Sequence, residues 1–499
     1  MNPEHDARTL GITQGVCEVC LKLVPAKVQA RGDEVWLLRF CPEHGEADGK
    51  IWAGVEDYLR TQRYVKPGWV PAAFEGDASK PCPEGCGFCE RHEQHLCMPI
   101  VEITNRCDLR CPACINGSGG QDKPADMTVE QFGRVIDRVL DAEKQINVLN
   151  LSGGEPLMHP QLLPILDEAV SRKDVVRVSI STNGLRFLSE PRLLDEIRKR
   201  NVVVSLQWDG ADDDVYRTLR GRALVEDKAR VLGLLEHNDI TTSLTMTLAG
   251  GRQDKELRGA LDLLFGKPNI VSMMIQPLAF AGRGAGLRDG GERMTIPDVI
   301  RALGDAGHPN VSREDFVPLP CSSPLCFSLA FYLMLDEPRD GAASGTRGAA
   351  SVSERAEPQR AVSINRLTDA ATMMDAVANR LLFGLAADEH EKLKQLIYDL
   401  WSGPVGAVPE GPAVLATLRG ILRSLQAPGC SCFDPRTAFN VAERKIKSIF
   451  IHAFQDASTF DLARVRRCCQ AYPQADGKLI PACVRNVMHA NRRWEGTRG

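Results

Sequence analysis

Three cysteines lie close together in the segment TNRCDLRCPAC, at Cys107, Cys111 and Cys114. Cysteine thiolates hold iron–sulfur clusters, and four of them would complete the ligand set of a [4Fe–4S] cluster. Three ligands leave one iron open, which suits a cluster that must bind a further molecule. A closed cluster with a remote fourth cysteine and a zinc knuckle are the alternatives, although zinc sites usually take their ligands in short-spaced pairs. The triad therefore predicts a reactive iron–sulfur cluster.

Two short-spaced pairs near the N-terminus predict a different kind of metal site. Cys17 and Cys20 form the first pair and Cys41 and His44 the second, with twenty residues between the pairs. Paired knuckles of this spacing are typical of a structural zinc site, or of a rubredoxin-like iron site in which one histidine replaces a cysteine. The spacing predicts one bound metal and leaves zinc and iron both open.

Further cysteines predict auxiliary clusters. Four of them fall within sixteen residues, at Cys82, Cys86, Cys89 and Cys97. They could form the complete ligand set of an auxiliary [4Fe–4S] cluster, and a zinc site is the alternative. The remaining cysteines lie far along the chain, at Cys321, Cys326, Cys430, Cys432, Cys468, Cys469 and Cys483. We expect a second auxiliary cluster to draw on Cys321, Cys326, Cys468 or Cys469, and Cys483, with some thiols to spare.

The composition places this chemistry in a reducing compartment. The 499 residues include seventeen cysteines, and the first sixteen residues lack the apolar core of a secretory signal. A net charge of −4 gives no electrostatic case for nucleic-acid binding. The longest apolar run, residues 325–335, is far shorter than the roughly 20 residues that cross a bilayer. We predict a cytoplasmic protein with no transmembrane segment.

The elements that must position these cysteines follow an alternating pattern. Between residues 99 and 280, six short apolar runs without a clean period of two alternate with amphipathic stretches, as expected of parallel strands buried on both faces. One of the helices is marked by a capping-box pair, Thr128 and Gln131. The pattern predicts an α/β fold, a partial (β/α)6 barrel, whose site lies at the carboxyl ends of the strands.

Other parts of the chain have a different character. Residues 1–75 are expected to form the small metal-binding module, 76–98 an auxiliary-cluster segment and 99–290 the barrel. Residues 291–499 are expected to form a mainly helical extension that carries auxiliary ligands. Within it, residues 337–362 are rich in Gly, Ala, Ser and charge, which predicts a flexible insertion.

Polar and small residues follow the predicted strands at the edge where the triad stands. The second strand ends in Gly153, Gly154, Glu155 and Pro156, the third in Ser181, Thr182 and Asn183, and the fourth in Gln207. Glycines let backbone carbonyls approach a ligand without a Cβ in the way. A carboxylate such as Glu155 could take a positive ammonium group. The turns at Asn183-Gly184 and Asp209-Gly210 could equally be plain turn chemistry.

The triad after the first strand, with GGEP ending the second, resembles the radical S-adenosylmethionine (SAM) superfamily. The resemblance implies that the open iron chelates the amino and carboxylate groups of SAM. One electron from the cluster would then cleave SAM to a 5′-deoxyadenosyl radical that attacks an unactivated C–H bond. By the same resemblance, the residues ending the third and fourth strands would touch the methionine carboxylate or the ribose.

The order of all the cysteine segments is similar to one subgroup of that superfamily, which contains pterin-methylating class D radical methyltransferases and tetraether lipid synthases. The resemblance implies carbon–carbon bond formation at an sp3 carbon, foremost methyl or one-carbon transfer to a small molecule. The alternative within the subgroup is coupling of lipid alkyl chains, which needs a long apolar channel and could bring peripheral membrane contact. A non-catalytic electron-transfer or scaffold protein is the alternative of another class. The expected partners are the substrate and an external electron donor such as ferredoxin or flavodoxin.

Overall fold

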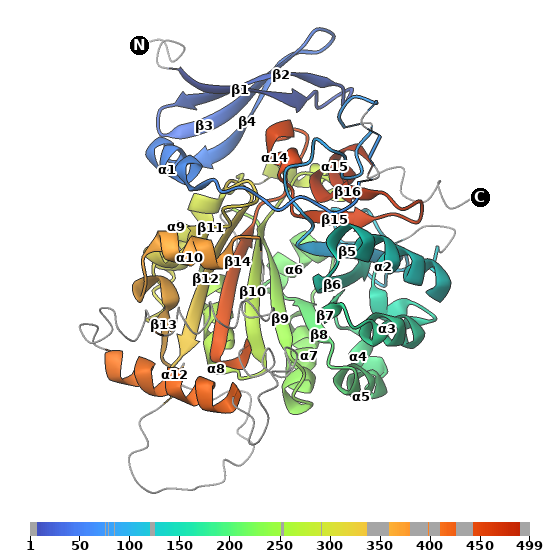
Figure 1. The fold of residues 1–499 in the computed structure, drawn as a ribbon, viewed down its shortest axis with the longest axis vertical. Helices are drawn as coiled ribbons and strands as arrows, with labels where there is room; N and C mark the ends of the chain where they lie inside the picture. The colour runs from blue at the N-terminus through green and yellow to red at the C-terminus, as the bar shows by residue number, and fades with distance from the viewer. Residues whose placement is uncertain are drawn as a thin grey trace, which may run out of the picture.

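A computed structural model describes residues 7–489, apart from 75, 78, 84, 120–124, 251–253, 291, 337–358, 380–397, 399–409 and 426–442. Cys430, Cys432 and most of the predicted insertion at 337–362 therefore lie outside the described residues. The chain begins with an antiparallel sheet in the order β1-β2-β3-β4, drawn in blue in Figure 1. The strands of this sheet are β1 (Arg8–Val16), β2 (Leu23–Arg31), β3 (Glu34–Cys41) and β4 (Gly45–Ala53). Helix α1 (Val55–Thr61) and the 3-10 turn η2 (Gln62–Tyr64) follow it.

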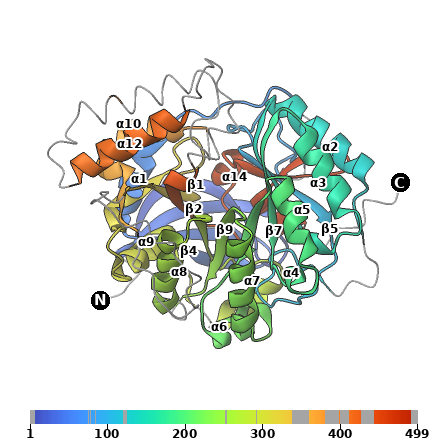
Figure 2. The same ribbon diagram turned by 90° about the horizontal axis from the view of Figure 1, so that it is seen from below.

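The centre of the molecule is a parallel sheet with helices on its outer face (Figures 1 and 2). Its strands are β5 (Met98–Thr104), β6 (Ile146–Gly153), β7 (Val175–Thr182), β8 (Val203–Gln207), β9 (Thr242–Leu248) and β10 (Ile270–Pro277). The connecting helices are α2 (Val129–Glu143), α3 (Leu162–Ser171), α4 (Arg186–Ser189), α5 (Arg192–Lys199), α6 (Asp213–Arg220), α7 (Val225–His237) and α8 (Asp254–Gly266), with 3-10 turns η3 (Pro156–Met158) and η4 (Gly282–Gly290). The predicted partial (β/α)6 barrel is thus confirmed.

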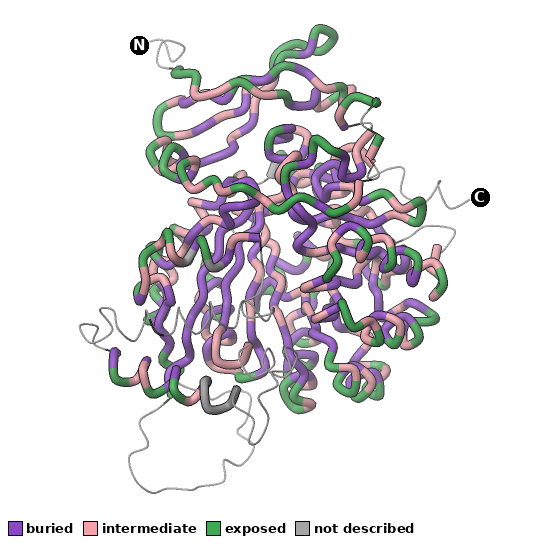
Figure 3. The backbone as a smooth tube through the Cα atoms, viewed as in Figure 1, coloured by how far each residue is buried: buried purple, intermediate pink, exposed green. Residues whose placement is uncertain are grey.

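Local sequence signals explain why these elements form. Thr128 and Gln131 make the predicted capping box of α2, each side chain bonding the other residue's backbone N–H. The apolar stripe of α2, including Phe132, Ile136 and Val139, is buried against the sheet. Figure 3 shows the strands as mostly buried and the outer helix faces as exposed. This is the burial expected where parallel strands are covered by amphipathic helices.

The C-terminal extension contributes strands to the same sheet, which the sequence patterns did not predict. Its strands are β11 (Val317–Pro318), β12 (Phe327–Met334), β13 (Ala361–Ser363), β14 (Ile446–His452), β15 (Gln470–Pro473) and β16 (Leu479–Pro481). Its helices are α9 (Ile296–Asp305), α10 (Ala370–Val377), α12 (Gly411–Leu425), α14 (Leu462–Arg466) and α15 (Ala482–Met488), with 3-10 turns η5 (Arg313–Asp315) and η6 (Ile364–Arg366). The full order is β11-β12-β14-β10-β9-β8-β7-β6-β5-β15-β16, so late segments extend both edges of the barrel sheet.

The N-terminal sheet lies over the end of the barrel where the parallel strands finish. Arg39 donates to the carbonyl of Ala457, just beyond β14, at 2.6 Å. Thr13 donates to Asp461 at 2.5 Å, and the backbone N–H of Ala53 donates to Thr295 at 3.2 Å. Through these contacts, the N-terminal sheet helps to cover the end of the barrel at which the triad stands.

Among the described residues, no helix combines the length and apolar character that crossing a membrane requires.

Candidate functional site

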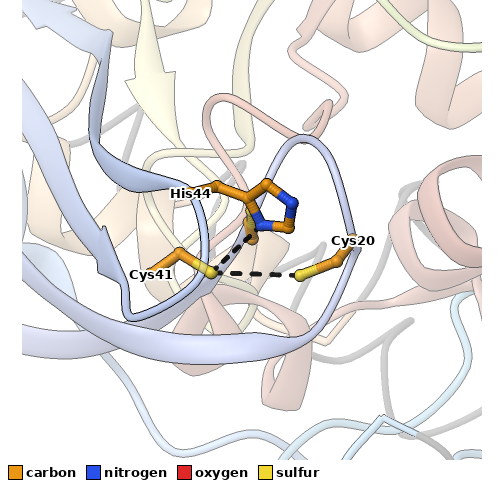
Figure 4. A group of neighbouring side chains, drawn as sticks. Cys20, Cys41 and His44 are labelled. Atoms are coloured by element: carbon orange, nitrogen blue, oxygen red, sulfur yellow. Dashed lines mark hydrogen bonds between the residues drawn. The ribbon is translucent and has the colours of Figure 1, made fainter.

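The N-terminal ligands meet between two hairpin turns. In the part of the chain that the structure describes, Cys17, Cys20, Cys41 and His44 are the one set of three or more Cys, His, Asp or Glu ligand atoms that all lie within 4.8 Å of one another. Figure 4 shows Cys20 and His44 turned toward Cys41, at 4.0 Å between the sulfurs and 3.4 Å from Sγ of Cys41 to Nδ1 of His44. Tetrahedral zinc with bonds of about 2.3 Å to sulfur holds two sulfurs about 3.8 Å apart. The arrangement fits a single, fully ligated metal ion.

The triad lies on the loop after β5, at the mouth of the barrel. Its three cysteines line one cavity of about 230 Å³. The strand-end residues named from the sequence line the same cavity, namely Gly153, Gly154, Glu155, Ser181, Thr182, Asn183 and Gln207. Pro156 does not line it and instead begins the buried turn η3. The structure thus gathers three thiols and a set of polar groups around a space that a small ligand can enter.

The two glycines of the GGEP segment lie close to the end of β5 and the start of the triad loop. A Cβ on Gly153 would lie 2.2 Å from the carbonyl oxygen of Thr104, and a Cβ on Gly154 would lie 2.1 Å from that of Arg106. The backbone N–H groups of Gly154 and Glu155 donate to these same two carbonyls, at 2.7 and 2.6 Å. Both glycines are therefore needed for the close approach of this backbone to the end of β5 and the start of the triad loop, and the predicted approach of a ligand to them stays a prediction. Side chains at these positions would push that loop away.

Glu155 joins the ends of β6 and β7. Its carboxylate is 1% exposed and accepts from the Thr182 hydroxyl at 2.6 Å, the Asn183 N–H at 2.8 Å and the Leu157 N–H at 3.1 Å. Burial raises the pKa of Glu155 to about 7. Asn183 in turn donates to Asp108, inside the triad loop, at 2.6 Å. Glu155 and Asn183 thus hold the loop in place, and contact of Glu155 with an ammonium group stays a prediction.

Three charged side chains at the mouth, Asp209, Arg220 and Lys228, were not predicted. Asp209 is fully buried and accepts two bonds from Arg220, at 2.6 and 2.8 Å, so it does more than form a turn with Gly210. Arg220 lines the triad cavity. Lys228 donates to the carbonyl of Asn183 at 2.6 Å and to Gln207 at 2.7 Å, and burial lowers its pKa to about 7. The sequence carries one signal for this ion pair, since Asp209 follows the fourth strand and the next helix ends in Arg220. Spacing alone cannot distinguish such a pair from an ion pair on the surface.

A second cavity of about 330 Å³ lies inside the barrel and shares residues with the first. Ser152, Ser181, Ser205 and Thr245 are among the residues that line both. Further inside, the lining continues through Asn150, Arg177, Ser179, Ser243, Ser272, Glu443, Gln470 and Tyr472. Several of these groups bond one another, such as Ser272 to Ser243 at 2.7 Å. The interior below the triad is therefore lined by a mixture of polar groups and apolar side chains, the latter including Met98, Ile100, Val203, Met274 and Phe450.

The other described cysteines form neighbouring groups from distant segments. Cys86 lies within electrostatic reach of Cys82 and Cys89. The neighbours of Cys97 are Cys469 and Cys321, since its thiol lies beside Cys469 and its N–H donates to the Cys469 carbonyl at 2.9 Å. The structure therefore associates Cys97 with a different pair of thiols from the predicted Cys82–Cys97 set.

A further thiol group comes from three separate segments. Cys468 lies within reach of Cys483 and Cys326. The guanidinium of Arg464 donates to the Cys326 sulfur at 3.3 Å. His92 and His95, which lie between Cys89 and Cys97 in the chain, are both buried, and Nε2 of His95 lies 3.5 Å from the Cys97 sulfur.

Comparisons with known families agree with this geometry. The Radical SAM superfamily matches residues 101–264, which span β5 to α8 and include the triad and GGEP. The HMPTM N-terminal zinc ribbon domain matches residues 9–53, which include all four N-terminal ligands. Residues 101–264 thus form a radical SAM domain, and the chain is a radical SAM iron–sulfur enzyme with a metal-binding N-terminal module. The alternative of a non-catalytic carrier or scaffold is wrong.

Among individual relatives, a 7,8-dihydro-6-hydroxymethylpterin dimethyltransferase of Methanocaldococcus jannaschii is 25% identical over 96% of this chain and 93% of that protein. A mycofactocin maturase of Mycolicibacterium smegmatis is 29% identical over 40% of this chain and 50% of that protein. A solved structure of SuiB from Streptococcus suis bound to S-adenosylmethionine is 13% identical, covers 42% of this chain and 46% of that chain, and has a TM-score of 0.35. The first of these relatives matches nearly the whole chain and is by its name a pterin dimethyltransferase, one of the two kinds of enzyme in the subgroup that the cysteine segments resemble.

The residues present fit the group that a radical SAM domain implies. Three thiols on one loop face a cavity, and the cysteine-rich donor set is that of a [4Fe–4S] cluster with one iron left for SAM. Among the described residues, the three triad sulfurs do not all lie within 4.8 Å of one another, as the N-terminal ligand atoms do. This agrees with a cluster, whose cysteine sulfurs lie farther apart than the ligands of a single ion.

Proposed function

We propose that the protein transfers methyl or one-carbon units to an sp3 carbon of a pterin-like heterocycle, as a class D-type radical SAM methyltransferase. The observation that carries the proposal is the inner cavity directly below the triad cavity, with which it shares part of its lining and in which hydroxyl, amide and charged groups stand among apolar side chains. The relative that matches nearly the whole chain is by its name a dimethyltransferase of a pterin. A hydroxyl- and amide-lined interior suits a heterocycle rich in hydrogen-bonding groups, because buried polar groups need partners.

In this proposal, Cys107, Cys111 and Cys114 hold the cluster. When bound, the cluster and SAM together supply a radical that can remove hydrogen from carbon. The polar groups at the ends of β7 and β8, Ser181 and Gln207 among them, orient SAM beside the open iron. The N-terminal sheet and the segment after β14 cover the mouth and limit the entry of water, which protects a reactive site from side reactions.

Coupling of lipid chains finds no comparable support in the cavities. The longest apolar run, residues 325–335, is the interior strand β12 and its flanks, and none of its residues lines either cavity. Phe327, Phe331 and Leu333 pack in core clusters instead. The inner cavity holds the buried ion pair of Arg177 and Glu443, a poor neighbour for an alkyl chain.

We further propose two auxiliary [4Fe–4S] clusters and an external donor such as ferredoxin or flavodoxin. Their ligands come from the remaining described cysteines, with Cys97 assigned to the group of Cys321 and Cys469 that surrounds it. Three clusters require about twelve irons per chain. If Cys97 and Cys469 share a cluster, Cys97→Ala, Cys469→Ala and the double variant should each lose the same roughly four irons. A double variant that loses twice as many would assign the two cysteines to different clusters.

The function is tested with anaerobically reconstituted protein, a reductant, SAM and 7,8-dihydro-6-hydroxymethylpterin. We expect mass spectrometry to find 5′-deoxyadenosine together with a pterin that carries additional methyl groups. A parallel reaction offers dialkyl lipid in vesicles, with no coupled product expected. Cleavage of SAM without change to the pterin, or coupling of the lipid, contradicts the proposal.

A further inference from the structure

One polar side chain in the lining of the inner cavity has hydrogen-bonding groups for which the described residues supply no partner. Gln470, the first residue of β15, is 2% exposed and lines the cavity. Among the described residues, neither its amide nitrogen nor its amide oxygen has a hydrogen-bond partner. An amide buried without partners costs about 1–3 kcal/mol for each unsatisfied group. A ligand that offers one acceptor and one donor side by side would satisfy both.

Strand register places Gln470 at the same level as a buried ion pair. Gln470 pairs with Met98, β5 and β6 are aligned at Ile100 and Asn150, and Val148 pairs with Arg177. Arg177 bonds Glu443 at 2.6 Å, both side chains are less than a tenth exposed, and both line the cavity. Gln470, Arg177 and Glu443 therefore define one layer near the amino ends of the strands, which we call the floor.

The chemistry of the floor complements one edge of a planar ring. A glutamine amide pairs with an adjacent ring N–H and C=O through two hydrogen bonds. A carboxylate has about four acceptor sites, so Glu443 can keep Arg177 as a partner and still accept from an exocyclic amino group. The guanidinium fixes that carboxylate in orientation. Together these groups suit a 2-amino-4-oxopyrimidine edge.

We infer that the floor formed by Gln470, Glu443 and Arg177 binds the amino-oxo pyrimidine edge of the substrate and so determines its specificity and orientation. This inference rests on the proposed function. The dihydropyrazine ring of the pterin, which carries the hydroxymethyl group and the sp3 ring carbon, lies at the opposite end of the bicycle from that edge. Seating the edge on the floor directs the other ring toward the shared lining of the two cavities and the triad beyond it.

The test measures pterin binding by the cluster-loaded, full-length protein under anaerobic conditions. Gln470→Met keeps the side chain's length and removes both hydrogen-bonding groups, and we expect the Kd for 7,8-dihydro-6-hydroxymethylpterin to rise about tenfold or more. Asn486→Leu is the matched control, because Asn486 is also a buried amide without partners among the described residues but does not line the cavity. Its Kd should equal that of the wild type, and both variants should bind SAM normally.

A second experiment compares two ligands on the wild-type protein and on one variant. Wild-type protein should bind the pterin about tenfold or more tightly than its 2-oxo analogue, which lacks the amino group, and Glu443→Gln should lose that preference. Equal affinity of the wild type for the two ligands, or an unchanged Kd in Gln470→Met, overturns the inference while leaving the proposed function standing. A wild type that binds SAM but no pterin contradicts the proposed function itself.

Discussion

The N-terminal module and the barrel both use cysteines, but they use them in opposite ways. In the module, four ligands from two turns converge within 4.8 Å and can enclose one ion completely. In the barrel, three cysteines from one loop face a cavity of about 230 Å³ and leave room for a small molecule. A metal whose coordination is complete holds structure, whereas a vacant coordination position allows chemistry. The number of protein ligands, more than their type, separates the two roles.

The surroundings of the two sites differ in the same sense. The module's ligands stand on short turns of one antiparallel sheet, so the metal itself ties the hairpins together. The triad loop is instead held from outside, through Gly154, Glu155 and Asn183. Arg283 adds bonds to the carbonyls of Cys111 at 2.9 Å and Ser118 at 2.8 Å. The barrel thus positions its loop through hydrogen bonds from residues that themselves line the triad cavity.

Removing the triad should produce the largest effect. With Cys107, Cys111 and Cys114 all changed to Ala, the reactive cluster has no ligands, so formation of 5′-deoxyadenosine should fall to background. The N-terminal metal should remain, because its four ligands are untouched. Chromatography of the reaction mixture and metal analysis of the same sample measure both. If the triple variant still makes 5′-deoxyadenosine, the assignment of the reactive cluster is wrong.

Gly154→Ala should have the next largest effect, although it changes no ligand. The added Cβ would meet the Arg106 carbonyl at 2.1 Å, so the triad loop must shift, with a cost of about 1–3 kcal/mol. We expect SAM cleavage to fall about tenfold or more. Gly11→Ala is the matched control, since nothing lies within 4 Å of its Cβ position. Equal cleavage rates in the two variants would mean that the backbone clamp does not position the triad.

Breaking the N-terminal site should have the smallest effect on the reaction. Cys41→Ser removes one of four ligands, so we expect loss of about one equivalent of metal and a lower unfolding temperature, because metal binding and folding are coupled in small modules. SAM cleavage per loaded cluster should stay within about twofold. His44→Cys replaces the histidine ligand with a fourth thiolate and should keep the metal. A Cys41→Ser protein that retains the metal would contradict the N-terminal ligand assignment. One that loses SAM cleavage as completely as the triple variant would contradict the mainly structural role of this site.

Local spacing was enough to predict the sites whose ligands lie close together in the chain. The CX3CX2C triad, the paired N-terminal knuckles and GGEP each occupy a short segment, and six apolar runs were enough to predict the parallel barrel. The predicted strand-end residues meet around one cavity because the carboxyl ends of parallel strands share an edge. Pro156 is the exception, since the 3-10 turn that it begins carries it away from the cavity.

Only the tertiary structure decided which distant residues meet. Cys97 lies beside Cys469 because β15 pairs with β5, a contact between residues 372 positions apart in the chain, and Cys321 joins them from a third segment. Gln470 and Glu443 reach the barrel floor for the same reason, because the C-terminal strands join both edges of a sheet that began at residue 98. Strand pairing of this kind is set by burial of whole faces rather than by any local pattern. The sequence by itself therefore determined the kind of chemistry, and the long-range packing determined the shape and polarity of the cavity in which it takes place.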